Sequence, residues 1–285
     1  MKIACLIVTY TSAAQTRRMI EMLNNGQFDF YIHLDKKVSI DSHKDLLQIP
    51  NVYFIKDRVD VQWAAYSTVQ AAFNGIKQIA ESNITYDFIN LITGQDYPIK
   101  SAEYIANFLS GNIGKQFIEF KGFDTDWQEA KARIEKYHFT NLHLAGKFRL
   151  EKLVNLFAGK RKAPVNMIFY GVSTFWTLSP ECALYVVNFV ENNKAFKSFL
   201  KYTWGSDEFI FQTVLMNSPY KDVIVNNNYR YVDWSAGGAR PKFLKTEDFE
   251  KITASDAFFG RKFNIDIDSN ILDMIDEQCK TANKS

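Results

Sequence analysis

Short continuous apolar runs alternate with amphipathic segments along the first hundred residues of the chain. The apolar runs have the length of strands covered on both faces, and the amphipathic segments repeat apolar residues at helical spacing. The predicted strands are residues 3–8, 28–34, 52–55 and 88–92, and the predicted helices are residues 13–23 and 67–79. This alternation predicts an α/β fold with a mostly parallel open central sheet flanked by helices.

The pattern is less regular in the rest of the chain. A helix is expected to begin at Ser179-Pro180, where a cap is followed by a first-turn proline, and a terminal helix is expected after Ile265. Further strands are predicted at residues 117–120, 171–178, 223–225 and 229–232. Because no repeat, low-complexity tract or linker interrupts the sequence, we expect a single domain over residues 1–285.

The segment 204–218 predicts a helix that is entered from a tight turn. Gly205 permits the turn, and Ser206 or Asp207 can cap the first free N–H groups. Apolar and small residues then recur near helical spacing, at Phe209, Ile210, Thr213, Leu215 and Met216, until Asn217-Ser218-Pro219 ends the helix.

Two adjacent carboxylates, Asp207 and Glu208, stand at the start of this helix. A carboxylate in this position can project into a cleft and act as a general base. The alternative interpretation is an acidic pair that merely favours the helix dipole. From this segment alone the second interpretation is preferred, and other parts of the chain reverse that preference.

Polar residues follow three of the predicted strands. Ligands of open α/β sheets lie outside the carboxyl ends of the strands, which here carry Thr9-Tyr10, Asp35-Lys36 and Gly94-Gln95-Asp96. Asp35 can hydrogen-bond a ribose or a base, or it can be a solvated loop acid. No Gly-x-Gly-x-x-Gly motif and no Gly-Lys-Ser/Thr loop is present, which argues against a dinucleotide fold and a P-loop enzyme.

The composition excludes several classes of protein. The 285 residues carry a formal net charge of +2, so no overall field indicates nucleic acid as a partner. Cys5, Cys182 and Cys279 form neither a metal-spaced pair nor a disulfide framework, which favours a reducing compartment. The apolar run at residues 3–8 is too short for a signal peptide or a membrane span, so we expect a cytoplasmic protein.

Two further groups of charged residues have alternative interpretations. Asp124 and Asp126 have the Asp-x-Asp spacing that can hold a divalent metal for a nucleotide sugar, although a surface loop is the preferred interpretation. The loop 235–238 is rich in glycine and can close over phosphates with neighbouring cations, or it can be an ordinary turn. These cations are Arg230, Arg240, Lys242, Arg261 and Lys262.

The segment 147–162 mixes apolar residues with six basic residues. Such a segment can lie on an anionic membrane surface, which would place the protein peripherally at the inner face of the membrane. The preferred alternative is a helix that packs on the domain and leaves its basic face in solvent.

Several stretches together resemble the core-2/I-branching β-1,6-N-acetylglucosaminyltransferase family, which includes the peptide O-xylosyltransferases. The stretches occur in the family's order over nearly the whole chain. They are FYIHLDKK at 30–37, RVDVQWAAYS at 58–67, FINLITGQDYPI at 88–99, GVSTFWTL at 171–178, SDE at 206–208, RYVDW at 230–234 and FFGRKF at 258–263. The sequence departs from the family at Ala64-Ala65, where two glycines are common. The disulfides of the animal enzymes are also missing, which fits a bacterial-type, cytosolic member.

The resemblance implies a GT-A type (Rossmann-like) glycosyltransferase that uses a UDP-sugar, inverts the anomeric centre and needs no metal or other cofactor. It implies that Glu208 is the catalytic base, with Asp207 as the second candidate. The family's diphosphate-binding lysine falls on Lys262, and its arginine falls on Arg240 or, alternatively, Arg230. The implied uridine-side residues are Val8, Tyr10, Asp35 and Trp63, and the implied acceptor-side residues are Glu119 and Trp234, with Asp96 near the junction.

From this resemblance we expect residues 1–100 to form a nucleotide-binding half and residues 101–285 an acceptor-binding and catalytic half. The transferred sugar is expected to be N-acetylglucosamine or xylose, and the acceptor a hydroxyl of a glycan, in polysaccharide biosynthesis. Two alternatives remain open. One is a metal-dependent UDP-sugar transferase that uses Asp124 and Asp126, and the other is a non-catalytic sugar-binding protein.

Overall fold

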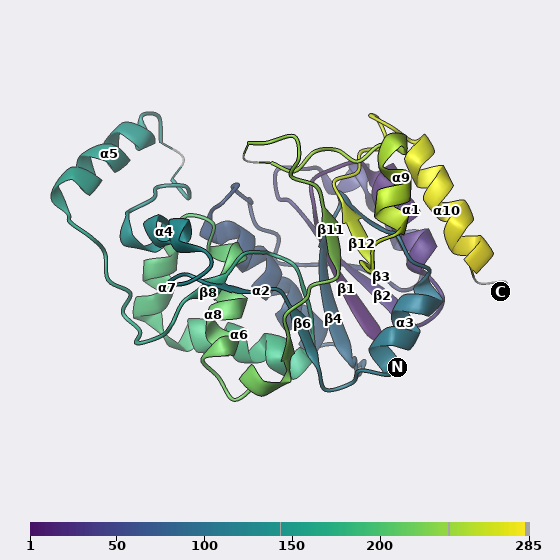
Figure 1. Ribbon diagram of the computed structural model, residues 1–285, viewed down its shortest axis with the longest axis horizontal. Helices are drawn as coiled ribbons and strands as arrows, with labels where there is room; N and C mark the ends of the chain where they lie inside the picture. The colour runs from purple at the N-terminus through teal and green to yellow at the C-terminus, as the bar shows by residue number, and fades with distance from the viewer. Residues whose placement is uncertain (143, 239, 283–285) are drawn as a thin grey trace. The chain divides into compact units, whose positions relative to one another are not determined.

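The computed structural model describes residues 1–142, 144–238 and 240–282, and its contacts divide the chain into two units (Figure 1). The first unit contains Met1–Ile55, Ile84–Gly114 and Asn228–Ser285, and the second contains Lys56–Asn83 and Lys115–Asn227. Each unit therefore takes chain from both sides of residue 100.

The first unit is built on four parallel strands in the order β4-β1-β2-β3. The strands are β1 (Ile3–Thr9), β2 (Phe28–Leu34), β3 (Val52–Phe54) and β4 (Phe88–Thr93). In register, Ile3 lies opposite Phe28 on one side and Phe88 on the other. Every residue of β2 is buried, as the continuous apolar run predicts for a strand covered on both faces.

Among its described residues, four helices and a small second sheet complete this unit. The helices are α1 (Ala13–Leu23), α3 (Ala102–Ser110), α9 (Phe249–Thr253) and α10 (Asn270–Ala282). Helices α9 and α10 lie side by side (Figure 1). The second sheet has the order β11-β12-β5, from β5 (Asp96–Pro98), β11 (Arg230–Val232) and β12 (Phe259–Arg261).

The second unit combines short strands with six helices among the described residues. Strand β6 (Gln116–Ile118) pairs parallel with β10 (Ile224–Val225) and antiparallel with β9 (Trp176–Leu178), while β7 (Lys121–Gly122) pairs antiparallel with β8 (Tyr170–Gly171). The helices are α2 (Tyr66–Ala80), α4 (Lys131–Glu135), α5 (Lys147–Phe157), α6 (Pro180–Asn192), α7 (Lys194–Lys201) and α8 (Ile210–Met216). The α/β class with mostly parallel strands and flanking helices is therefore confirmed.

The helix predicted from residue 206 onwards is interrupted. A 3₁₀ turn, η4 (Ser206–Glu208), is separated from α8 by Phe209, whose φ of −142° is not helical. The expected side-chain cap is wrong, because neither Ser206 nor Asp207 caps the turn and the N-cap position is Gly205 at φ +64°. The strand predicted at 171–178 is likewise divided, into β8 and β9.

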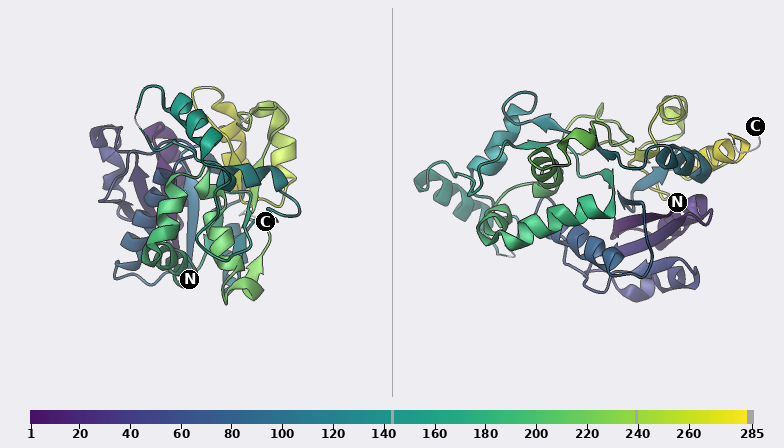
Figure 2. Two further views of the ribbon diagram at one scale, coloured as in Figure 1. Left: turned by 90° about the vertical axis from the view of Figure 1, so that its left-hand side faces the viewer. Right: turned by 90° about the horizontal axis from the view of Figure 1, so that it is seen from below.

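Helix α5 contradicts the expectation that it packs on the domain by its apolar side. None of its residues is buried, and its leucines and phenylalanines are exposed. The helix lies at the outer end of its unit, beyond α4 (Figures 1 and 2).

The cysteines agree with the sequence analysis. Cys5, Cys182 and Cys279 are free and buried, and burial raises the pKa of each thiol, to about 12, 12 and 11 respectively. Within the described part of the chain, no helix has the length and apolar character needed to cross a membrane.

Candidate active site

Glu208 lies in the second unit, in contact with an arginine that the sequence analysis did not single out. Nη1 of Arg133 donates a short hydrogen bond to Oε2 of Glu208. The Arg133 guanidinium also stacks between two rings, 4.4 Å from the centroid of Trp127 and 4.3 Å from that of Trp204. The Glu208 side chain is still 34% exposed. The carboxylate is therefore held in one position and remains accessible to a substrate.

The backbone of Glu208 is fixed from the neighbouring strand. The N–H of Val172 donates to the Glu208 carbonyl over 2.8 Å. A Cβ on Gly171 would approach that carbonyl oxygen to 2.7 Å and the Cβ of Phe209 to 2.5 Å. Only glycine at position 171 therefore allows β8 to lie this close to the turn that carries Glu208.

The same turn is attached to the start of α2. The N–H of Gly205 donates to the carbonyl of Ala64 over 2.8 Å, and Ala64 itself has a φ of +57°. This is the position at which glycines are common in the family that the sequence resembles. The left-handed conformation gives a physical reason for glycine there, because only glycine adopts it without a steric cost.

Asp207 has different surroundings from its neighbour. Its Oδ2 accepts a 2.8 Å hydrogen bond from the Thr174 hydroxyl, while its Oδ1 is enclosed and has no hydrogen-bond partner among the described residues. Burial raises the pKa of Asp207 to about 6, and the charge of Glu208 adds to the effect. Of the two carboxylates, Asp207 thus has one enclosed oxygen, whereas the Glu208 side chain is 34% exposed.

Two other predicted residues lie in the second unit. Trp63 is largely exposed and meets the ring of Trp204 edge-on, with centroids 5.4 Å apart. It therefore lies next to the tryptophan on which Arg133 stacks. Glu119 is half-buried, and its backbone carbonyl accepts a 3.2 Å hydrogen bond from Gln212 in α8. Gln212 also donates to the carbonyl of Ser173, two residues after Gly171.

The predicted uridine-side residues of the first unit lie at the carboxyl ends of β1 and β2. Val8 is half-buried near the end of β1, and Tyr10 follows the strand with an exposed side chain. Asp35 follows β2, and its N–H donates to the carbonyl of Thr9 over 2.8 Å. The Asp35 carboxylate is buried and accepts from the N–H of Lys37 over 2.9 Å. The topology therefore brings Val8, Tyr10 and Asp35 to one edge of the sheet.

Asp96, the residue predicted to lie near the junction, is fully buried. Its Oδ2 accepts hydrogen bonds from the backbone N–H and the hydroxyl of Thr93, the latter over 2.8 Å. Its Oδ1 lies 3.6 Å from Nη1 of Arg261, the residue opposite Asp96 in the β5–β12 pairing. Asp96 therefore orders the β4–β5 turn and positions Arg261.

The cations in the last fifth of the chain fall into two groups. Lys242 forms a 2.6 Å ion pair with Asp248. Arg230 donates to the side chain of Asn90 over 2.5 Å and stacks 4.5 Å from the centroid of Phe259, and burial lowers its pKa to about 10. Both side chains thus make their contacts with other residues of the protein, which disfavours Arg230 as a phosphate ligand.

Lys262 and Arg240 form the second group. Neither makes an ion pair within residues 1–142, 144–238 and 240–282. Burial lowers the pKa of Lys262, and the positive charges of Arg261 and Arg240 lower that pKa further. Several cations thus lie close enough to repel one another, an arrangement that a bound anion relieves. Trp234, the predicted acceptor-side residue of this unit, follows β11 and is exposed.

Asp124 and Asp126, the aspartates of the metal-dependent alternative, contact different partners. Asp124 is exposed and forms a 2.7 Å ion pair with Lys131, and Asp126 accepts a 2.9 Å hydrogen bond from Thr125. No group of three or more His, Cys, Asp or Glu side chains in the described ranges has the geometry of a metal site.

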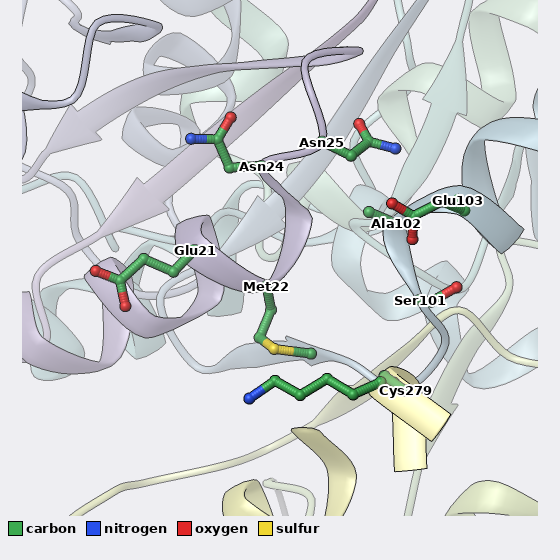
Figure 3. Close-up of a pocket in the computed structure, with 9 residues that line it drawn as sticks. Glu21, Met22, Asn24, Asn25, Ser101, Ala102, Glu103 and Cys279 are labelled. Atoms are coloured by element: carbon green, nitrogen blue, oxygen red, sulfur yellow. The ribbon is translucent and has the colours of Figure 1, made fainter. Parts of the chain in front are cut away.

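A pocket in the first unit contains none of the predicted site residues. It is lined by residues of α1, α3 and α10 and of the loop after α1, and its volume is about 200 Å³ (Figure 3). The charged residues that line it are Glu21, Glu103 and Lys280, so Lys280 is the one cation among the lining residues that could contact a phosphate. The raised pKa of Cys279 keeps the thiol in this wall neutral at physiological pH.

The chain matches the family model described as Core-2/I-Branching enzyme over residues 3–257, and it therefore belongs to that family. It is similar to Xylosyltransferase 2 of Rattus norvegicus, at 26% identity over 97% of this chain and 33% of that protein. It is also similar to Xylosyltransferase 1 of Homo sapiens, at 27% identity over 97% of this chain and 30% of that protein. The chain thus spans about a third of the length of the curated relatives it matches.

Solved structures with a similar fold include the galactosyltransferase LgtC in complex with donor and acceptor sugar analogs (9% identity, TM-score 0.45, 93% of this chain and 87% of that chain). Another is the apo form of mouse xyloside xylosyltransferase 1 (9% identity, TM-score 0.42, 91% of this chain and 96% of that chain). Because both scores are below 0.5, the family assignment rests on the sequence match. The α/β organisation agrees with the GT-A type that the family resemblance implies.

Proposed function

We propose that this chain is an inverting glycosyltransferase that moves N-acetylglucosamine or xylose from a UDP-sugar to a hydroxyl of a glycan acceptor. The observation that carries the proposal is the state of Glu208, a carboxylate that Arg133 holds in place and that remains accessible. The resemblance to the family whose model the chain matches implies the same role for Glu208.

The reaction is a single in-line displacement. The acceptor oxygen attacks C1 of the donor sugar, the bond from C1 to the phosphate oxygen breaks, and UDP leaves with the electron pair. Glu208 takes the proton of the attacking hydroxyl, for which its oxygen must come within about 2.6–3.2 Å of the acceptor oxygen. Asp207 is the second candidate, but its enclosed Oδ1 and its hydrogen bond to Thr174 favour Glu208.

Charge that develops on the leaving diphosphate needs preorganised cations. We assign this task to Lys262 and Arg240, because they lack an ion-pair partner in the described residues while Arg230 and Lys242 are engaged within the fold. Arginine can contact a phosphate with two parallel hydrogen bonds, and lysine acts as a point charge. In this proposal the two side chains replace the divalent metal that many UDP-sugar transferases use.

The remaining assignments follow the family resemblance. The resemblance assigns the uridine to Val8, Tyr10, Asp35 and Trp63. Trp234 and Glu119 would contact the acceptor, the former through stacking of its exposed ring on a sugar. Asp96 would act indirectly, by positioning Arg261.

The test is UDP release from UDP-N-acetylglucosamine and UDP-xylose with a panel of glycoside acceptors. We expect the Glu208→Gln variant to bind UDP like the wild type and to lose about two to four orders of magnitude in turnover. The matched control is Glu191→Gln, because Glu191 lies in the same unit, is similarly exposed and also forms an ion pair, with Lys77 at 2.7 Å. The control is expected to keep wild-type turnover.

Two outcomes would contradict the proposal. Wild-type turnover in Glu208→Gln would show that another group is the base. Sugar or UDP binding without turnover of either donor, with any acceptor, would favour the non-catalytic sugar-binding alternative.

A further inference from the structure

Helix α5 is attached to its unit by its polar side. Asn155 makes a reciprocal pair of 2.8 Å hydrogen bonds with the backbone of Tyr137, accepting from its N–H and donating to its carbonyl. Glu151 accepts from the N–H of Phe139 over 2.8 Å. Lys147 donates to two backbone carbonyls that precede the helix. The side chains that would normally face solvent thus face the protein.

The apolar side chains of α5 face solvent instead. Leu156 and Phe157 are 73% and 79% exposed, and Phe148, Leu150 and Leu153 are also exposed. A helix that packs on its own domain buries this stripe. Contiguous exposed apolar side chains of this kind mark a surface that another body covers.

The charges on this side are all positive. Arg149 and Lys152 are exposed among the apolar residues, and Lys162 is exposed just beyond the helix. Glu151 is the one acidic residue in the segment 147–162, and it faces inward. The covering body must therefore offer apolar groups and negative charge together. A second copy of this chain, docked through the same face, would place like charges opposite one another.

The segment that follows α5 is anchored, which keeps the helix in place. Arg161 donates to the carbonyls of Tyr202 and Phe199, and its guanidinium stacks 4.1 Å from the centroid of the Phe199 ring. Lys160 is neutralised by Glu135 at 2.8 Å. The six basic residues therefore divide into three that hold the segment and three that stay available to a partner: Arg149, Lys152 and Lys162.

We propose that the outward face of α5 docks on an anionic lipid surface. The leucines and phenylalanines enter the boundary between head groups and acyl chains, and Arg149, Lys152 and Lys162 lie at the level of the negatively charged head groups. The proposal is independent of the transferase function, because it uses none of the residues assigned to donor, acceptor or catalysis.

The test is flotation of the 285-residue chain with vesicles. Phosphatidylcholine vesicles are compared with vesicles that contain phosphatidylglycerol as well, at low and high salt. We expect binding to the anionic vesicles at low salt, weaker binding at high salt, and little binding to phosphatidylcholine alone. Each basic residue near the surface contributes about a fivefold change in binding, so Arg149→Gln combined with Lys152→Gln should weaken binding about twenty-five-fold.

The apolar contribution is tested by Leu156→Ser combined with Phe157→Ser. We expect this variant to lose binding by at least about tenfold, because its two most exposed apolar side chains are removed. The matched control is Leu47→Ser combined with Ile113→Ser, which removes exposed apolar residues of the first unit and should bind like the wild type. Circular dichroism melting checks that each variant is folded.

Two results would overturn the proposal. One is a wild-type protein that does not float with anionic vesicles at low salt, or whose binding is unchanged by the α5 substitutions. The other is a dimer in light scattering that Leu156→Ser with Phe157→Ser dissociates while no vesicle binding is found, which would assign the face to a second copy of the chain.

Discussion

Two groups of cations in this molecule differ in how their charge is compensated. In the second unit, Arg133 is paired with Glu208 and covered on both faces by Trp127 and Trp204. In the first unit, Lys262 and Arg240 lie near Arg261 without a carboxylate of their own within the described residues, and the pKa of Lys262 is lowered by burial and by these like charges.

The difference indicates two separate tasks. A cation that is paired and stacked on both faces serves to position its partner, which here is the candidate base. Like charges that lie close together, as Lys262 and Arg240 do beside Arg261, are unfavourable to the fold, and an anionic ligand removes that disadvantage. The comparison therefore predicts that changing Arg133 affects the protein itself, whereas changing Lys262 affects ligand binding.

The largest effect is expected from Arg133→Ala. The substitution leaves Glu208 without its partner and removes the stacking with both tryptophans. The free energy of unfolding should therefore fall by roughly 2–3 kcal/mol. This is less than for a fully buried ion pair, because both side chains keep some exposure. Arg133→Lys should recover only part of this loss, because lysine lacks the planar guanidinium. Denaturant unfolding measures both changes.

Arg149→Ala is the control for this prediction, because Arg149 is an exposed arginine of the same unit. It should unfold like the wild type. If Arg133→Ala were equally harmless and kept full turnover, Arg133 would not be what positions Glu208.

The next effect is on ligand binding. Lys262→Ala should weaken UDP binding about ten- to hundredfold, which is the typical worth of a hydrogen bond between charged groups. The exposed Lys251 of the same unit supplies the control, and Lys251→Ala should leave UDP affinity unchanged. Because the pKa of Lys262 is lowered from its usual 10.5, wild-type affinity should also decline as the pH rises toward that value. Equal UDP affinity in Lys262→Ala and wild type would remove Lys262 from the site.

Asp207→Asn is expected to change how stability depends on pH. The pKa of this carboxyl is raised from 3.8 to about 6 in the folded protein, so its contribution to stability is lost as the pH rises between these values. The free energy of unfolding of the asparagine variant should therefore rise relative to that of the wild type, by on the order of 2 kcal/mol, between pH 4 and pH 7. Urea unfolding across this range measures the gain. A difference between variant and wild type that stays constant with pH would contradict the burial argument.

The smallest effect is expected from Ala64→Gly. The left-handed conformation of residue 64 costs alanine about 1–2 kcal/mol, and glycine removes this cost. Glycine also makes the unfolded chain more flexible, which lowers the free energy of unfolding by about 0.4–1 kcal/mol and so offsets part of the gain. The melting temperature should therefore rise slightly. The neighbouring Ala65 has an ordinary φ of −104°, so Ala65→Gly should lower it. A fall in both variants would show that Ala64 is not strained.

The regular parts of the fold could be predicted from the sequence because their signals are local. The apolar runs of β1, β2 and β4 and the periodicity of α1 and α2 fixed these elements to within a residue or two. The placement of Asp35 and Tyr10 at the carboxyl ends of adjacent strands followed from the same pattern. Family membership was predicted from seven short stretches in their order, and the family model confirms it.

The environment of Glu208 could not be predicted, because its contacts join residues far apart in the chain. Arg133 and Glu208 are 75 positions apart, and nothing in the local sequence of Arg133 distinguishes it from a surface arginine. The engagement of Arg230 with Asn90, which disfavours it as a phosphate ligand, joins positions 140 apart. Helix α5 was misjudged because its leucines fit a buried stripe, and only the contacts of Asn155 and Glu151 decide which side faces inward.

The most direct test of the account is a calorimetric titration of UDP, and then of UDP-N-acetylglucosamine, into the wild-type protein in EDTA. If Lys262 and Arg240 hold the diphosphate, UDP binds in the micromolar range without metal, and added manganese does not change the affinity. Binding that appears only after manganese is added would contradict the account and assign the diphosphate to a metal held by carboxylates such as Asp124 and Asp126.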